Sequence, residues 1–172
     1  AGYLDAMKQG DYDKALSYVQ AGIPDSYQQQ IEELLGQLDQ AAMKKLLKAI
    51  YGNMNYKILS TEKNGEDSAS VKVRVTNIDL KSVVSDVLGE YVSWVMMQLL
   101  SGSTPGESEY AAKLAELLMT SISNNRDSKV TSEVEVPVVK TDDGWKIASM
   151  SLLGSAAGGG LLDGLGGWDL GY

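Results

Sequence analysis

The spacing of apolar side chains divides the chain into four blocks that are helical and extended in turn. Residues 3–50 repeat apolar side chains every three to four positions, as one face of a helix does. Residues 56–76 alternate apolar and polar side chains, which is typical of strands with one buried face. The helical spacing returns over 80–122 and the alternation over 130–147. This order predicts an α+β fold with N-terminal helices, a β-hairpin, a helical block and a second β-hairpin, in which the helices cover one antiparallel sheet.

The N-terminal block is expected to hold a broken helix followed by a longer one. Gly10 interrupts the first apolar stripe, and Asp11 is placed to cap the part that resumes after it. Asp25 with Gln28 three positions later resembles a capping box, which would open a second helix running to Ile50.

Each alternating block contains a turn signal that makes it a hairpin. Asn64-Gly65 separates the strands of the first block, and Asp142-Asp143-Gly144 separates those of the second. Pro137 cannot donate a hydrogen bond to a ladder, so it marks an edge or a bulge. On the first strand, Tyr56, Ile58 and Ser60 are predicted to lie on one side. On the return strand, one side is predicted to carry Ala69, Val71, Val73 and Val75, and the other Ser70, Lys72, Arg74 and Thr76, so that one face of the sheet lies on the core.

The helical block between the hairpins is expected to supply the central helix of the domain. The apolar stripe from Leu80 to Leu99 is wide enough for burial on more than one side, and Asp79 precedes it as a cap. A second helix is expected to begin with Thr104 as its N-cap, Pro105 at its first position and Glu107 at its third.

The last 22 residues differ in composition from the rest. Residues 151–172 hold eight of the 18 glycines, yet they also hold several leucines. The segment is therefore more apolar than disordered segments usually are. We therefore expect one α+β domain over residues 1–150 and a Gly-rich apolar tail over 151–172, part of which packs onto the domain or onto a partner.

Composition removes several classes of function. The chain has 15 Lys and Arg against 23 Asp and Glu, and the resulting net charge of −8 disfavours nucleic acid as a partner. No run approaches the roughly 18 to 20 apolar residues that a membrane-spanning helix needs. The absence of Cys and His excludes thiolate and imidazole chemistry, and Asp142 with Asp143 offers too few oxygens for calcium, so we expect neither metal nor cofactor.

Few residues remain that could form a site. Asp79 is the best single candidate for acid or base chemistry, although Asp at such a corner usually serves as a helix cap. Tyr56, Tyr91, Trp94 and Met96 are candidates for lining a ligand pocket, while a stripe of such residues at helical spacing is more often plain core.

Three segments resemble a known family. Residues 3–15, with Lys8-Gln9-Gly10-Asp11-Tyr12, resemble the opening of secreted nuclear transport factor 2-like domains. Residues 69–80 and 140–147, the latter reading K-T-D-D-G-W-K-I, resemble lipoproteins of unknown function from Gram-positive, often gut-dwelling, bacteria. The resemblance implies a curved antiparallel sheet wrapped around helices into a cystatin-like cone with a pocket. It also implies an extracytoplasmic location on a lipid anchor attached upstream of Ala1, with no other contact to the membrane.

The resemblance and the residues together favour a binding role. Enzymes of this superfamily, such as ketosteroid isomerases and dehydratases, use Asp, Tyr or His in the pocket, but no motif here carries those roles. We therefore expect a non-catalytic binding or interaction domain at the cell surface whose partner is a small molecule, a peptide, an envelope protein or a second copy of the chain. The alternative is an isomerase-like or dehydratase-like enzyme that uses a buried Asp or Tyr.

Overall fold

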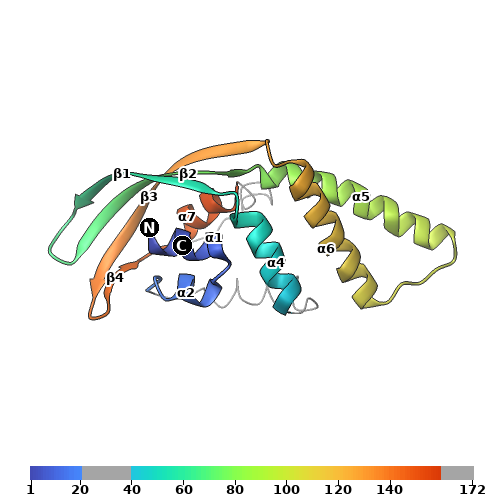
Figure 1. Cartoon of the computed structure of the whole chain (residues 1–172), viewed down its shortest axis with the longest axis horizontal. Helices are drawn as coiled ribbons and strands as arrows, with labels where there is room; N and C mark the ends of the chain where they lie inside the picture. The colour runs from blue at the N-terminus through green and yellow to red at the C-terminus, as the bar shows by residue number, and fades with distance from the viewer. Residues whose placement is uncertain (21–39, 160–172) are drawn as a thin grey trace, which may run out of the picture.

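A four-stranded antiparallel sheet and a set of helices make up the computed structural model, which describes residues 1–20 and 40–159 (Figure 1). The predicted α+β class is confirmed. In chain order the elements are α1 (Gly2–Gln9), α2 (Tyr12–Leu16), α4 (Gln40–Tyr51), β1 (Asn55–Lys63), β2 (Ser68–Ile78), α5 (Leu80–Leu100), α6 (Glu107–Asn124), β3 (Lys129–Thr141), β4 (Gly144–Ile147) and α7 (Ser151–Ala157).

Both predicted hairpins belong to one sheet. The strand order is β1-β2-β3-β4, and β2 pairs with β3 along its whole length, from Ser68 opposite Val139 to Ile78 opposite Lys129. The predicted alternation on β2 is confirmed, because Val73 and Val75 are buried while Lys72 is exposed on the other face.

The predicted turns fall where the sequence places them. The first loop runs over residues 64–67, longer than a two-residue turn, and both Asn64 and Gly65 donate backbone hydrogen bonds to the carbonyl of Ser68. The second turn is tight, and Gly144 follows it with a φ of 106° that favours glycine. Pro137 pairs with Ser70 of β2 on one side, but pairing of β3 with β4 begins only at the next residue, Val138. Pro137 therefore lies where one side of β3 is an edge, the first of the two positions predicted for it.

Strand β1 departs from strict alternation. A β-bulge at Leu59 leaves Ile58 opposite Val73 but places Ser60 opposite Lys72 on the outer face. The prediction that Tyr56, Ile58 and Ser60 share one face is therefore wrong at Ser60. The inserted residue turns Thr61 and every second residue after it toward the helices.

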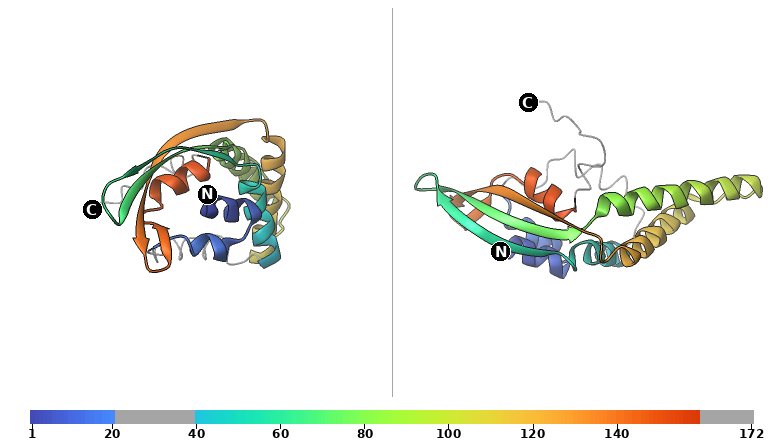
Figure 2. Two further views of the ribbon diagram at one scale, coloured as in Figure 1. Left: turned by 60° about the vertical axis from the view of Figure 1, so that its left-hand side comes forward. Right: turned by 90° about the horizontal axis from the view of Figure 1, so that it is seen from above.

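The inner face of the sheet curves around α1, α2 and α7 (Figure 2). Gly10, with a φ of 72°, ends α1, and the Asp11 carboxylate caps α2 by accepting from the Lys14 backbone N–H, as the sequence predicts. The helices bury an apolar cluster against the valines of β2 and β3. Its members from α1, β2, β3 and α7 include Leu4, Met7, Val75, Val136, Leu153 and Ala156.

The start of the glycine-rich tail belongs to this cluster. Helix α7 buries Leu153, Ala156 and Ala157, and the Asn77 side-chain amide donates to the Ala157 carbonyl at 2.6 Å. The expected packing of part of the tail is confirmed for this stretch, whereas residues 160–172 lie outside the described residues. The predicted capping box at Asp25 and Gln28 also lies outside them.

Helices α5 and α6 form an arm that extends beyond the sheet (Figures 1 and 2). At its base, Ile78, Leu80, Val83 and Val87 join Leu117 and Ile122 of α6 and Leu46 of α4 in a second apolar cluster. The Asp79 carboxylate accepts from the backbone N–H of Ser82, so the predicted N-cap is confirmed.

The prediction that α5 is a central helix buried on more than one side is wrong. Beyond Val87 its apolar residues are largely exposed because the helix has left the sheet behind, and Met97 is 67% and Leu100 87% exposed. The exposed apolar side chains of this distal half (Leu88–Leu100) are Leu88, Val92, Met96, Met97, Leu99 and Leu100.

The predicted start of the next helix is also wrong. Helix α6 begins at Glu107, and Gly106 rather than Thr104 is its N-cap. The Glu109 carboxylate accepts from the Gly106 backbone N–H at 2.9 Å, which satisfies the first turn in the way that Glu107 was expected to do.

We predict that substitutions at the two ends of α5 differ strongly in their effect on stability. Met96→Ser, on the exposed distal half, should change the free energy of unfolding by less than about 0.5 kcal/mol, whereas Val83→Ala, at the fully buried base, should cost about 2 kcal/mol. Urea unfolding of both variants measures the difference. Equal losses would mean that the distal half is covered in the folded protein.

Candidate ligand-binding site

A hollow opens on the inner face of the sheet, between the strand ends near both hairpin turns and the start of α1. Its volume is about 470 Å³, within the range of small-molecule sites. We call it the inner hollow. It is lined by Ala1, Gly2, Tyr3, Tyr18, Thr61, Lys63, Ala69, Val71, Val138, Trp145, Lys146 and Ile147.

The lining is mainly apolar and aromatic. Val71, Val138 and Ile147 come from three neighbouring strands, so their side chains share the inner face by the alternation of the sheet. Trp145 is 44% exposed although it is large and apolar. An exposed indole beside a valine-lined wall is a surface on which a flat or apolar molecule can pack.

A short backbone pairing holds one wall of the inner hollow. The Ile147 N–H donates to the Tyr18 carbonyl at 2.7 Å, and the Gln20 N–H donates to the Ile147 carbonyl at 2.9 Å. The segment after α2 therefore runs along the free edge of β4. The Lys146 ammonium reinforces this pairing by donating to the Ser17 carbonyl at 2.6 Å.

Gly2 allows the Tyr18 ring to lie against α1. A Cβ at Gly2 would approach the Tyr18 ring to 2.5 Å, closer than carbon atoms can pack. The absence of a side chain at this position thus lets the aromatic wall close on the helix.

The charged groups that line the inner hollow are cationic. Lys63 comes from the end of β1 and Lys146 from β4, and within residues 1–20 and 40–159 no Asp or Glu is among the lining residues. This is opposite in sign to the net charge of −8 of the whole chain.

The four residues predicted to line a pocket lie in two other places. Tyr56 packs against the cluster under the sheet and donates its hydroxyl hydrogen bond to Asp5 at 2.9 Å. Tyr91 and Trp94 lie on the arm, with ring centroids 6.1 Å apart, and Met96 on the same helix is 55% exposed. The structure brings Tyr91 and Trp94 together and separates Tyr56 from them, and none of the four is among the residues lining the inner hollow.

Sequence reasoning missed Tyr18, Lys63 and Trp145 as lining residues. The alternation around the Asp-Asp-Gly turn carried a usable signal for Trp145, since it pairs with Lys140 two positions from the inner residue Val138. Nothing in the local pattern marks Lys63, because its orientation depends on the bulge.

A cluster of tyrosines, one buried and two partly buried, lies where α1, α2 and α4 meet. Burial raises the pKa of Tyr3 far above its usual value, and the nearby Tyr51 and Tyr12 hydroxyls add to the effect. Burial, followed by the neighbouring Tyr12, raises the pKa of Tyr51 to about 12. These hydroxyls therefore stay protonated near neutral pH and cannot act there as general bases.

The described part of the chain buries no carboxylate. Each Asp and Glu within residues 1–20 and 40–159 is exposed, apart from the partly exposed Asp79, whose two oxygens accept from the backbone and hydroxyl groups of Ser82. In the same residues, no group of three or more acidic side chains could hold a metal ion, and no helix is long and apolar enough to cross a membrane.

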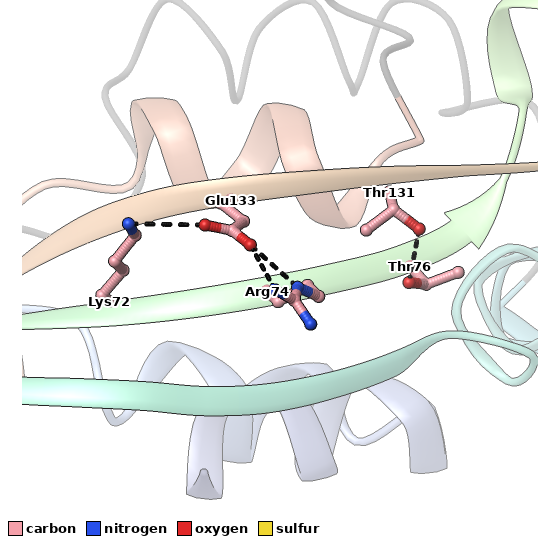
Figure 3. Close-up of polar contacts among 5 residues, drawn as sticks. All are labelled: Lys72, Arg74, Thr76, Thr131 and Glu133. Atoms are coloured by element: carbon pink, nitrogen blue, oxygen red, sulfur yellow. Dashed lines mark hydrogen bonds and ion pairs between the residues drawn. The ribbon is translucent and has the colours of Figure 1, made fainter.

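The outer face of the sheet carries a polar ladder (Figure 3). Glu133 on β3 accepts from the Arg74 guanidinium at 2.6 Å and lies 3.4 Å from the Lys72 ammonium. The hydroxyls of Thr76 and Thr131 are 2.8 Å apart further along the same pair of strands. Hydrogen bonds from Arg74 and then Lys72 lower the pKa of Glu133.

We predict that Glu133→Gln destabilises the protein only where the carboxylate is charged. A lowered folded-state pKa stabilises the fold above the usual carboxyl value of 4.5, and this stabilisation disappears as pH falls through the lowered pKa. Thermal unfolding at neutral pH and low salt should separate the variant from wild type, and the gap should close in acid or high salt. A gap that persists unchanged in acid would show that the side chain contributes by packing instead.

Comparison of the chain with protein-family models, with curated proteins and with solved structures gave no match.

Proposed function

We propose that this chain is a non-catalytic binding domain that takes a small, partly apolar molecule into the inner hollow. The carrying observation is the lining itself, in which aromatic and valine side chains from α1, the segment after α2 and the sheet face an open volume of about 470 Å³. An apolar hollow with a few polar groups is the usual form of a small-molecule site.

The same proposal includes the finer fold and the location. Curvature of the sheet around α1, α2 and α7 supports a nuclear transport factor 2-like, cystatin-like cone. The resemblance of residues 3–15, 69–80 and 140–147 supports a lipid-anchored domain at the surface of a Gram-positive cell. In that setting the ligand would be an extracellular small molecule or an apolar part of a peptide or envelope protein.

An isomerase or dehydratase gains no support from the geometry. Such an enzyme needs a buried acid or base tuned to work near neutral pH. The carboxylates within the described ranges are exposed or, at Asp79, engaged in a helix cap, and the tyrosines with raised pKa values keep their protons.

A thermal-shift screen against amphipathic small molecules tests the binding role. A ligand at about 100 times its Kd should raise the free energy of unfolding by about 2.7 kcal/mol. The shift should be lost in Trp145→Ala, which removes the exposed ring at the inner hollow, and retained in Trp94→Ala, which removes an indole from the arm. Absence of any shift at millimolar ligand across the screen would refute the proposal.

A further inference from the structure

Building on the proposed function, we propose that the inner hollow selects molecules that join an apolar or aromatic body to an anionic group such as a carboxylate. Lys63 and Thr61 of β1 would contact the anion, and Trp145, Tyr18 and the valines would contact the body.

The bulge at Leu59 sets the sign of the charge in the inner hollow. Unbroken alternation after Ile58 would turn Ser60 and Glu62 inward. With the bulge, Glu62 pairs with Ser70 on the outer face, while Lys63 pairs with the buried Ala69. One extra residue in the strand thus exchanges a carboxylate for an ammonium at this wall.

Thr61 and Lys63 form a two-residue anion contact. They are two positions apart on one strand, so their Cα atoms are separated by about 6.6 Å and both side chains point to the same face. The Thr61 hydroxyl has one hydrogen to donate and the Lys63 ammonium has three. Lys63 has no ion-pair partner within residues 1–20 and 40–159, so its donors are available to a ligand.

The surrounding charges favour the same sign of ligand. Lys146 uses one of its donors on the Ser17 carbonyl but keeps its positive charge beside the inner hollow. Among the described lining residues both charged side chains, Lys63 and Lys146, are cationic and none is a carboxylate, so the local potential favours an anion over a cation.

The apolar part of the ligand has its own wall. Val71 and Val138 lie on the central strands, and Tyr18 with Trp145 adds aromatic surface on the β4 side. An uncharged polar molecule would gain nothing from this wall, and a plain hydrocarbon would gain nothing from Lys63. The pairing of both features in one hollow is therefore what defines the ligand class.

Matched ligand pairs test the inference by calorimetry on the full chain. The pairs are naphthylacetate with naphthylacetamide and decanoate with decanamide, which share a body and differ in charge. The acid of each pair should bind about three- to tenfold more tightly than its amide at low salt, because an exposed lysine contributes a modest, screened attraction. Lys63→Gln should remove that preference and leave amide binding unchanged.

Lys57→Gln is the matched control. Lys57 lies on the same strand but pairs with Arg74 on the outer face, so its loss changes the net charge equally without touching the inner hollow. The control should keep the preference for the acid. Loss of preference in both variants would assign the effect to net charge and overturn the inference.

Two further outcomes separate the inference from the proposed function. Equal binding of acid and amide by the wild-type chain would overturn the anion preference and leave small-molecule binding in place. Failure of every ligand to bind, in a chain whose melting curve is cooperative, would remove both.

Discussion

Replacing Gly159 with alanine is expected to lower the free energy of unfolding by about 3 kcal/mol. Gly159 follows α7 with a φ of +57°, and a Cβ there would overlap the carbonyl oxygen of Ile78. The strained backbone costs about 1 kcal/mol for a residue with a side chain, and a steric conflict with main-chain atoms adds an overpacking cost of about 1–3 kcal/mol. Urea denaturation measures the loss.

Gly154→Ala, within α7 itself, is the matched control. Within residues 1–20 and 40–159, no atom outside the adjacent backbone of its own helix lies within 4 Å of the position that its Cβ would take, and its backbone is helical. The substitution should therefore stabilise the protein by about 0.5–1 kcal/mol through helix propensity. If Gly159→Ala were as stabilising as Gly154→Ala, α7 would not be seated on the corner between β2 and α5.

The second large effect is expected for Asn77→Asp, at about 3–5 kcal/mol near neutral pH. Asn77 is fully buried, and its amide donates to the Ala157 carbonyl at the end of α7. Its own carbonyl oxygen has no hydrogen-bond partner within the described residues. An ionised Asp would place a charge against an acceptor with no compensating donor, which costs several kcal/mol.

This loss should depend on pH in a defined direction. Burial without a cation raises the folded-state pKa of the new Asp above its unfolded value of about 3.9. The destabilisation is therefore smallest below about pH 4, where the acid is neutral and can donate to Ala157, and it grows as pH rises through the folded pKa.

Asn77→Leu provides the reference for Asn77→Asp. It has similar branching but a larger volume, and it removes both the donor and the orphaned acceptor, so it should cost about 1–3 kcal/mol by leaving the Ala157 carbonyl unpaired and by crowding the site. That cost should not change with pH. Parallel pH profiles for the two variants would mean that the site is reached by water.

The parts of the fold that local chemistry decides could be predicted from the sequence. The valine alternation of β2 and β3 fixes which face is buried, and Asp11 and Asp79 cap their helices because the free N–H groups of a first turn need an acceptor. Both hairpin turns follow from residues that favour reversal of the chain.

Helix α5 could not be predicted in the same way. Its apolar stripe from Leu80 to Leu99 has the periodicity of a buried helix, and periodicity reports an apolar surface without saying what covers it. Coverage depends on where the sheet ends, and the sheet ends at Ile78, so burial stops with Val87. The exposure of the apolar side chains beyond Val87 thus follows from how α5 is placed relative to the sheet and not from the sequence of the helix.

The inner hollow escaped prediction for a related reason. It depends on a pairing between residues 18–20 and β4, which are more than 120 positions apart. It also depends on the bulge at Leu59, which no glycine or other turn-favouring residue marks in the sequence. The predicted residues Tyr91 and Trp94 are neighbours at helical spacing. On the arm the Trp94 ring packs against those of Tyr91 and Tyr110, and neither predicted residue lines the inner hollow.

The two described tryptophans stand at separate ends of the molecule, and this gives the protein two built-in optical reporters. The Trp145 indole borders the inner hollow, while the Trp94 ring is held edge-on to Tyr110 with centroids 5.5 Å apart. Fluorescence from Trp145 will respond to a ligand that enters the inner hollow. Fluorescence from Trp94 will respond to a change in the packing of the arm. In a background in which Trp168 is replaced by phenylalanine, further replacement of either Trp94 or Trp145 by phenylalanine leaves a single emitting indole, so each event can be followed separately without any attached dye.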